Sequence, residues 1–205
     1  KDWQPTEQHL LVVRFFLREA DGVLATTQAL RERLAGLNQN VVVVTNALDE
    51  RLLIRREPPN EHPLFGLGRK VIGYMGTLTH DDDLMMVLPA LRKVWQRHRE
   101  EVEFQIVGVV GRQETIQVLN ELSVRVINPK SEDVEYPRFM SWFSDHIDWD
   151  IAISPLKDTP FNRCKSDIKF LDYSGIGVPG IYSRVPAYES SVRHLETGWL
   201  AENNA

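Results

Sequence analysis

The pattern that most constrains the fold is an alternation of short apolar runs with longer segments of helical periodicity. The apolar runs begin near Val71, Val102, Val124, Trp149 and Gly180, and an amphipathic stretch follows each of the first four. Strands that alternate with helices in this way pair in parallel through right-handed crossovers. The chain is therefore predicted to be an α/β protein, with a parallel sheet flanked by helices.

The first fifty residues repeat this alternation on a smaller scale. Helical periodicity over residues 6–20 and 27–37 alternates with apolar runs at 22–26 and 41–44. The second run is four consecutive valines, which predicts a strand covered on both faces. Residues 54–69 are polar, proline-rich and without periodicity, as expected for a linker. We expect a partial α/β unit in 1–53 and a larger domain, truncated at its C-terminus, in 70–205.

Composition excludes several classes of protein. The net charge is −5 and no block of basic residues occurs, which argues against a nucleic-acid partner. A single cysteine, Cys164, excludes an internal disulfide and fits a reducing compartment. No stretch is typical of a signal peptide or a spanning helix. The six histidines show no metal-binding spacing and no G-x-S-x-G elbow is present, so we predict neither a metal site nor an esterase triad.

Ligands of parallel α/β sheets bind beyond the carboxyl ends of the strands. In Gly73-x-x-Gly76-Thr77, a strand-to-helix turn could bring a diphosphate close to the backbone. The G-x-G-x-x-G spacing is absent, so a plain tight turn is the favoured explanation of the glycines. The loops after four predicted strands are therefore expected to lie together at the carboxyl edge of the sheet. They are the loops at Gly76, Gly108, Pro155 with Leu156, and Ser183.

The segment from Asn162 to Ser183 predicts a loop, a short helix with Ser166 as its N-cap, a glycine stop and a buried strand. Lys165 and Lys169 lie where the positive end of the helix dipole disfavours cations. Two lysines, a serine and open backbone N–H groups suit a phosphate. Asp172, on the same side, could accept a hydrogen bond from a sugar hydroxyl. The alternative is a solvated helix with a Lys169–Asp172 ion pair.

Asp172-Tyr173-Ser174-Gly175-Ile176-Gly177-Val178-Pro179, followed by Ile181 and Ser183, resembles the E-A-x-A-x-G-x-P-V-x-x-S signature of GT-B glycosyltransferases. It is most similar to the retaining family called glycosyl transferase group 1. The run from Ala20 to Asp49 resembles the end of the acceptor-side domain of that family, and Thr197-Gly198-Trp199-Leu200 resembles its closing E-T-G-x-L strand.

The resemblance implies a Rossmann-like, nucleotide-sugar donor-binding domain preceded by a remnant of the acceptor-side domain. It implies a retaining hexosyltransferase of polysaccharide biosynthesis that requires no metal or other cofactor. Its partners would be a nucleoside-diphosphate sugar and a glycan, lipid-linked or protein acceptor. The location implied is the cytoplasm. For a full-length enzyme, peripheral attachment to the inner face of the membrane is the alternative left open. The fragment is expected to bind nucleotide without transferring sugar.

The same resemblance implies roles for individual residues. Asp172 would hold the ribose, and the loop at Pro155 and Leu156 would contact the base. Lys165 and Lys169 would neutralise the leaving diphosphate and so act in catalysis. The remaining nucleotide-sugar contacts would be Gly76, Thr77, Gly108 and Ser166.

Two positions depart from the family pattern. Leu78-Thr79-His80-Asp81 stands where the family has a basic residue, which makes Lys165 and Lys169 the expected replacement. Cys164 stands where the family has a second acid, eight residues before Asp172, and Asp158 is the other candidate for that role. A nucleophilic role for Cys164 is not expected, because no histidine is near it in the sequence.

Two other functions stay open on the sequence. One is a nucleotide-sugar epimerase or phosphorylase on the same two-domain plan. The other is a non-catalytic, flavodoxin-like regulatory domain that uses Asp81, Asp82 and Asp83. We interpret this acidic cluster instead as carboxylates in the first turn of a helix capped by Thr79, where the helix dipole stabilises negative charge.

Overall fold

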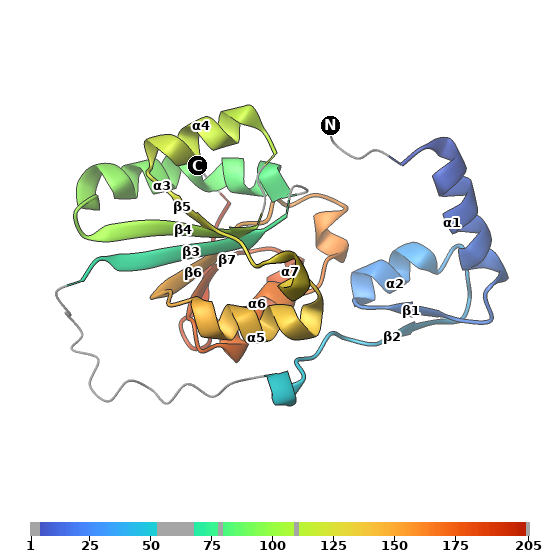
Figure 1. The fold of residues 1–205 in the computed structure, drawn as a ribbon. Coiled ribbons are helices and arrows are strands. Elements are labelled where there is room, and N and C mark those ends of the chain that lie inside the picture. Colours follow the sequence, from blue (N-terminus) through green and yellow to red (C-terminus); the bar gives the residue numbers. More distant parts are fainter. Residues whose placement is uncertain (1–4, 53–67, 78–79, 109–110, 204–205) are drawn as a thin grey trace.

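A six-stranded parallel sheet forms the body of the protein (Figure 1). We describe it from a computed structural model that describes residues 5–52, 68–77, 80–108 and 111–203. The strand order is β5-β4-β3-β6-β7-β8, and every neighbouring pair is parallel. The strands are β3 (Lys70–Gly76), β4 (Val102–Gly108), β5 (Arg125–Ile127), β6 (Ile151–Ser154), β7 (Gly180–Ser183) and β8 (Trp199–Ala201). The predicted fold class is confirmed.

Helices cover both faces of this sheet (Figure 1). They are α3 (Asp81–His98), α4 (Gln113–Glu121), α5 (Tyr136–His146), α6 (Ile168–Gly175) and α7 (Pro186–Glu189). Their order along the chain follows the predicted alternation. The predicted cap of α3 at Thr79 lies outside the described residues, and His80 occupies the N-cap position without a side-chain cap bond.

Two apolar cores pack on the two faces because successive strand residues point to opposite sides. On β3, Tyr74 belongs to the core beneath α3 and α4, whereas Met75 packs against the core beneath α5 and α6. Ala152 and Ile153 of β6 divide in the same way. The sheet is thus fixed from both sides, and its carboxyl edge is left for the loops.

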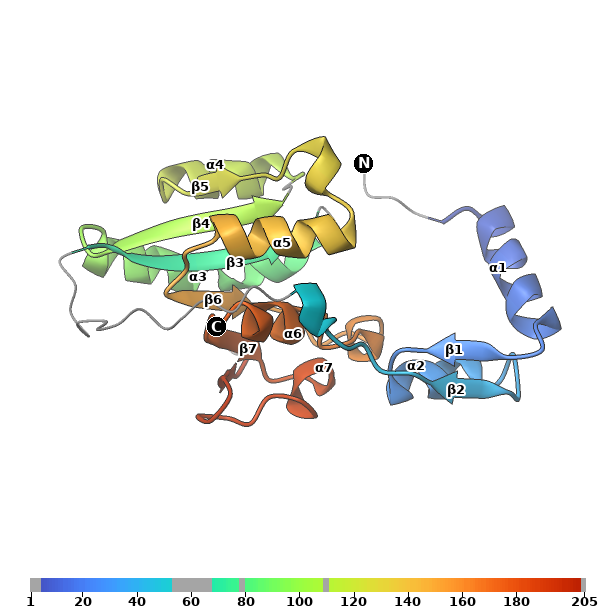
Figure 2. The same cartoon turned by 60° about the horizontal axis from the view of Figure 1, so that its bottom comes forward.

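The N-terminal unit consists of α1 (Glu7–Glu19), β1 (Val23–Ala25), α2 (Gln28–Leu34) and β2 (Val41–Val43), and it lies to one side of the large sheet (Figure 2). β1 and β2 form a two-stranded parallel sheet. The prediction that residues 41–44 are covered on both faces is wrong: Val42 is 51% exposed and Val44 53%. α1 forms as predicted, but none of its residues is buried.

Hydrogen bonds from Thr27 and Asn46 join the N-terminal unit to the larger domain. The Thr27 hydroxyl donates to the Cys164 carbonyl at 2.9 Å, and Asn46 Nδ2 donates to Ser166 Oγ at 2.7 Å. The chain then forms the short 3-10 helix η1 (Glu50–Leu52). Most of the linker predicted at 54–69 lies outside the described residues, so its boundaries stay a prediction.

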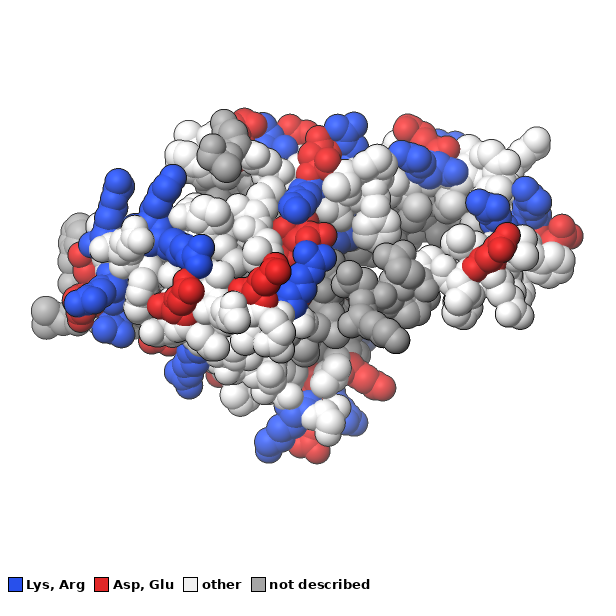
Figure 3. All heavy atoms as spheres, turned by 90° about the horizontal axis from the view of Figure 1, so that it is seen from above, with Lys and Arg blue, Asp and Glu red and all other residues white. Residues whose placement is uncertain are grey.

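Both acidic and basic side chains are present on the face of the molecule shown in Figure 3. None of the described helices is long and apolar enough to cross a membrane.

Because Gly73 of β3 has no side chain, an aromatic ring can lie directly against the strand at this position. A Cβ at this position would lie 1.8 Å from the Trp149 ring, whose Nε1 donates to Gln105 Oε1 at 3.1 Å. Gly73 therefore has a packing role, whatever the loop beyond it binds.

We expect Gly73→Ala to reduce the free energy of unfolding by about 3 kcal/mol, because neither the ring nor the strand can move without strain. Gly36→Ala is the control, since no atom lies within 4 Å of its added Cβ. Urea unfolding followed by tryptophan fluorescence measures both. Equal stabilities for the two variants would contradict the packing role.

Candidate functional site

A cavity of about 440 Å³ opens at the carboxyl end of β3 and β4. It is predominantly apolar, with a few polar groups at one side. Its lining residues are Met75, Gly76, Thr77, His80, Val107, Gly108, Asn128, Pro129, Val134, Phe139, Ile168 and Lys169. An apolar cavity with a small number of placed polar groups at the carboxyl edge of a parallel sheet is the usual form of a small-molecule site.

Two glycines from neighbouring strands line the cavity. Gly76 and Gly108 are paired in the β3–β4 register. Gly108 has φ +117°, and a Cβ there would lie 1.8 Å from the Gly76 carbonyl oxygen. Only glycine fits this approach. Its N–H donates to Asn128 Oδ1 at 3.2 Å, which holds Asn128 in the wall. The structure thus brings together three predicted positions, Gly76, Thr77 and Gly108.

Lys169 lines the same cavity from the first turn of α6. It is 8% exposed, and its Nζ lies 4.9 Å from the centroid of the Tyr74 ring. Among the described residues, no ion pair to Lys169 is formed, so the alternative of a solvated Lys169–Asp172 pair is wrong. Burial and the charge of Lys165 lower the pKa of Lys169 to about 8, against the opposing effects of Asp83 and Asp172.

The start of α6 differs from the prediction. The helix begins at Ile168 with Asp167 in the N-cap position, so Ser166 is not the cap. The hydroxyl of Ser166 instead accepts the hydrogen bond from Asn46. The Asp167 carboxylate takes a short hydrogen bond from the Ser191 hydroxyl, at 2.5 Å. Ser166 is therefore part of the contact between the two units, and it does not line the cavity.

Lys165 lies just before the helix and is half-buried. Its Nζ is 3.5 Å from Nδ1 of His80 and 5.2 Å from the centroid of the Phe161 ring. Burial lowers the pKa of Lys165, and the charge of Asp83 opposes that shift. Lys165 does not line the cavity itself, but it contacts His80, which lines the cavity together with Lys169.

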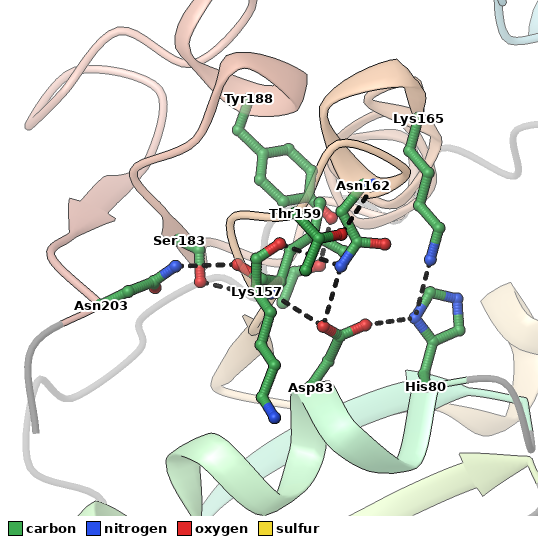
Figure 4. Close-up of polar contacts among 11 residues, drawn as sticks. His80, Asp83, Lys157, Thr159, Asn162, Lys165, Ser183, Tyr188 and Asn203 are labelled. Atoms are coloured by element: carbon green, nitrogen blue, oxygen red, sulfur yellow. Dashed lines mark hydrogen bonds and ion pairs between the residues drawn. The ribbon is translucent and has the colours of Figure 1, made fainter.

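Asp83 connects that wall to the loop after β6 (Figure 4). Its Oδ1 accepts hydrogen bonds from the Lys157 N–H at 2.7 Å and from Asn162 Nδ2 at 3.2 Å. Its Oδ2 lies 2.9 Å from His80 Nδ1. Burial raises the pKa of Asp83, but these hydrogen bonds and Lys165 lower it by more, so the carboxylate is ionised.

Asp81 plays a similar part at the other side of the helix start. Its Oδ2 accepts from the backbone N–H groups of Gly111 and Arg112 at 3.0 and 2.8 Å. The predicted first-turn position of the acidic cluster is confirmed, but Asp81 and Asp83 are also buried loop anchors. A phospho-acceptor role is not favoured, because both carboxylates are already engaged.

Asp172 lies one turn after Lys169 and is 3% exposed. The Tyr136 hydroxyl, from the first residue of α5, donates to its Oδ1 at 3.1 Å. Burial raises the pKa of Asp172 to about 6, while the Tyr136 hydrogen bond and Lys169 oppose that shift. Asp172 borders the cavity region without lining it. Tyr136 was missed by sequence reasoning, because nothing in the sequence pairs α5 with α6.

The remaining predicted positions lie farther from the cavity. The Leu156 N–H donates to Ser183 Oγ at 2.9 Å and its carbonyl accepts from Asn203 Nδ2 at 2.9 Å, so both backbone groups are occupied. Pro155 is buried beside it. Asp158 forms an exposed ion pair with Arg163. The Cys164 thiol donates to the Pro160 carbonyl. None of these four side chains lines the cavity.

The parallel sheet, the glycine approach and the cavity at the carboxyl edge define a Rossmann-like ligand-binding domain. Residues 69–205 match the family model described as glycosyl transferases group 1. The chain belongs to that family. No curated protein matches its sequence.

Solved structures of glycosyltransferases share this fold. A crystal structure of Anabaena HepE in complex with UDP and glucose has a TM-score of 0.66 at 16% identity, over 96% of this chain and 54% of that one. WaaG, a glycosyltransferase involved in lipopolysaccharide biosynthesis, has a TM-score of 0.66 at 12% identity, over 96% and 55%. Sucrose-phosphate synthase from Thermosynechococcus elongatus has 0.64 at 13%, over 98% and 50%. The chain spans about half the length of these proteins.

The depressed pKa of Lys169 predicts a variant that is more stable than the wild type. The charged amine destabilises the fold at every pH below about 8, and the penalty disappears as pH rises from about 8 towards 10.5. We expect Lys169→Met to raise the free energy of unfolding at pH 7 by about 2 kcal/mol, with a smaller gain at pH 10. Lys93→Met, on the exposed side of α3, is the control. Urea denaturation at both pH values measures the difference, and a destabilised Lys169→Met at pH 7 would contradict the burial cost.

The Tyr136–Asp172 hydrogen bond predicts a change in titration. Asp172 has a raised pKa, so its contribution to stability falls as pH rises from below 3.8 through about 6. Tyr136→Phe removes a donor to the carboxylate and should raise this pKa by about one further unit. Carbon-detected NMR titration of the Asp172 carboxyl group measures it. An unchanged midpoint would show that the hydroxyl does not stabilise the ionised form.

Proposed function

We propose that this chain is the donor-binding domain, with part of the acceptor-side domain, of a retaining, metal-independent glycosyltransferase. It would move a sugar from a nucleoside-diphosphate sugar to a glycan, lipid-linked or protein acceptor. The observation that carries the proposal is Lys169: a buried ammonium group at the edge of a ligand-sized cavity, without a carboxylate in ion-pair contact among the described residues. A buried charge of this kind is costly unless a counter-ion joins it.

The cavity divides into parts that suit the parts of a nucleotide. Its apolar side, with Val134 and Phe139, suits the flat faces of a base, and Asn128 adds an amide there. Gly76 and Gly108 line the cavity without side chains, and the diphosphate would lie against their backbone. We therefore propose that the base lies near the loop after β5, which contributes Asn128 and Pro129 to the cavity lining. The base contact expected at Pro155 and Leu156 stays a prediction. It is not favoured, because the N–H and carbonyl groups of Leu156 already form hydrogen bonds with Ser183 and Asn203.

Asp172 is the proposed ribose contact. Its Oδ1 is taken by Tyr136 and its carboxylate is nearly closed off from solvent. The ribose hydroxyls would meet Asp172 Oδ2, or would replace the Tyr136 hydroxyl, which can turn away because Tyr136 is itself 40% exposed.

The proposed mechanism uses protein charges in place of a metal. As the glycosidic bond breaks, negative charge grows on the leaving diphosphate. Lys169 and Lys165 are held beside that position and stabilise this charge without reorganising. The low dielectric around Lys169 strengthens the interaction, and the bound anion returns its pKa towards the ordinary lysine value. The acceptor would enter from the side of the N-terminal unit. We propose that residues 1–205 bind nucleotide but transfer no sugar.

Calorimetric titration of the chain with UDP, GDP and ADP in EDTA tests the proposal. At least one should bind, and at 100 times its dissociation constant should stabilise the fold by about 2.7 kcal/mol. Lys169→Met should weaken that binding about tenfold or more, through loss of a charge-assisted hydrogen bond, and Lys165→Ala should weaken it as well.

The corresponding nucleoside separates a phosphate role from a general effect. Neither lysine variant should change nucleoside binding, and Lys93→Met should change neither ligand. If the wild-type protein binds none of the three diphosphates in EDTA, the proposed function is contradicted. Equal losses for nucleoside and diphosphate would remove the phosphate role of the lysines.

A further inference from the structure

His80 brings a third nitrogen-bearing side chain to the wall that carries Lys165 and Lys169. It occupies the N-cap position of α3 and lines the cavity. Its Nδ1 is 2.9 Å from Asp83 Oδ2 and 3.5 Å from Lys165 Nζ (Figure 4). The side chain is 17% exposed, so its orientation is set by the protein.

The two neighbours of Nδ1 determine which ring nitrogen carries the proton. A carboxylate can only accept hydrogen bonds, and a lysine ammonium can only donate them. The closer neighbour, Asp83, is at hydrogen-bonding distance and therefore requires a proton on Nδ1. In the neutral ring Nε2 then holds the free lone pair, on the side of the ring turned away from Asp83 (Figure 4).

Asp83 cannot easily rotate to release the ring. It is 3% exposed, and its other oxygen accepts hydrogen bonds from Lys157 N–H and from Asn162 Nδ2. Asn162 is itself held, since its Nδ2 also donates to the Lys157 carbonyl at 2.9 Å. The carboxylate is thus fixed from the loop after β6, and it fixes the imidazole in turn.

The charged groups acting on His80 come from two elements besides its own. The hydrogen bond to Asp83 raises the pKa of His80, but burial and the charges of Lys169 and Lys165 lower it by more, so the pKa lies below its ordinary value. The ring is therefore neutral at pH 7 in the empty cavity. A diphosphate that enters beside the lysines would screen them and add negative charge, and both effects favour the imidazolium.

We propose that His80 is a further contact for the diphosphate of the donor, that it takes up a proton at Nε2 when the diphosphate binds, and that Asp83 is its positioning residue. The proposal rests on the proposed function, because it places the diphosphate at this wall. The proton comes from solvent and forms an N–H bond at Nε2, while Nδ1–H stays on Asp83. When the diphosphate leaves, the proton returns to solvent.

Histidine NMR gives the direct test. Imidazole Cε1–H signals are titrated from pH 4.5 to 9 with and without inorganic pyrophosphate, and the His80 signal is assigned by its loss in His80→Gln. Pyrophosphate should raise the pKa of His80 by about one unit or more. His98 is the internal control, since it pairs with Glu101 at 3.4 Å in the same i,i+3 relation at the exposed far end of α3. An unchanged His80 midpoint at saturating pyrophosphate would overturn the proposal.

Binding of UDP and of pyrophosphate at pH 6 and pH 8.5 gives the second test. At pH 6, His80→Gln should bind both ligands about tenfold more weakly than the wild type. At pH 8.5 the difference should be clearly smaller, because protonation of the wild-type ring costs more free energy at the higher pH. His80→Lys should keep the affinity at both pH values and show less pH dependence than the wild type. His98→Gln should match the wild type throughout.

The outcomes separate this proposal from the proposed function. If the wild type binds UDP and His80→Gln binds it equally at both pH values, His80 has no part in the site and the donor-binding function stands. If the wild type binds none of UDP, GDP, ADP and pyrophosphate, both fall together. Asp83→Asn distinguishes positioning from contact: it should lower the pKa of His80 while leaving a measurable pyrophosphate-induced shift. A pKa of His80 unchanged by Asp83→Asn would exclude the positioning role.

Discussion

The site depends on one buried carboxylate, Asp83. It accepts hydrogen bonds from Lys157 N–H, Asn162 Nδ2 and the His80 ring, and so joins the start of α3 to the loop after β6. Its charge acts on both Lys165 and Lys169, and Asp172 adds a second carboxylate near Lys169. Among the described residues, neither carboxylate forms an ion pair with Lys169. Under the proposed function, the diphosphate of the donor would make that direct contact in the cavity beside Lys169.

Desolvation of the two lysines has opposite consequences for stability and for binding. It depresses the pKa of both lysines, so the fold is less stable than it would be with apolar side chains there. The same desolvation prepares the amines for an anion, because less solvent has to be removed and less side-chain freedom is lost when it arrives. Residues that weaken the fold in order to hold a charge ready are typical of functional sites. Burial acts on Asp172 in the same way, and raises the pKa of its carboxyl group to about 6.

Sequence periodicity was sufficient for the fold, because each strand of the large sheet is a local pattern of apolar residues. It failed where burial depends on other segments. Four valines predict a strand covered on both faces, but α2 packs on the β1–β2 sheet and covers the face of Val41, whereas Val42 on the opposite face is exposed. The site was predicted in part. Lys169, Gly76 and Gly108 follow from local rules about helix starts and glycine turns. Asp83 and Tyr136 do not, because their partners are 79 and 36 residues away in the chain. Ser166 was misplaced by one helix position, and its real partner, Asn46, lies in the other unit.

That contact bears on how the two units act together. The hydrogen bonds from Thr27 and Asn46 reach the residues immediately before and after Lys165, namely the Cys164 carbonyl and the Ser166 hydroxyl. The backbone that carries Lys165 is therefore held by the N-terminal unit on both sides. On its other flank the same loop is held by Asp83 through Lys157 and Asn162. Lys165 thus has its position set jointly by the N-terminal unit and by the sheet domain. A change in the angle between the units would act first on this residue, whereas Lys169, which is anchored in α6 over the Tyr74 ring, would keep its place.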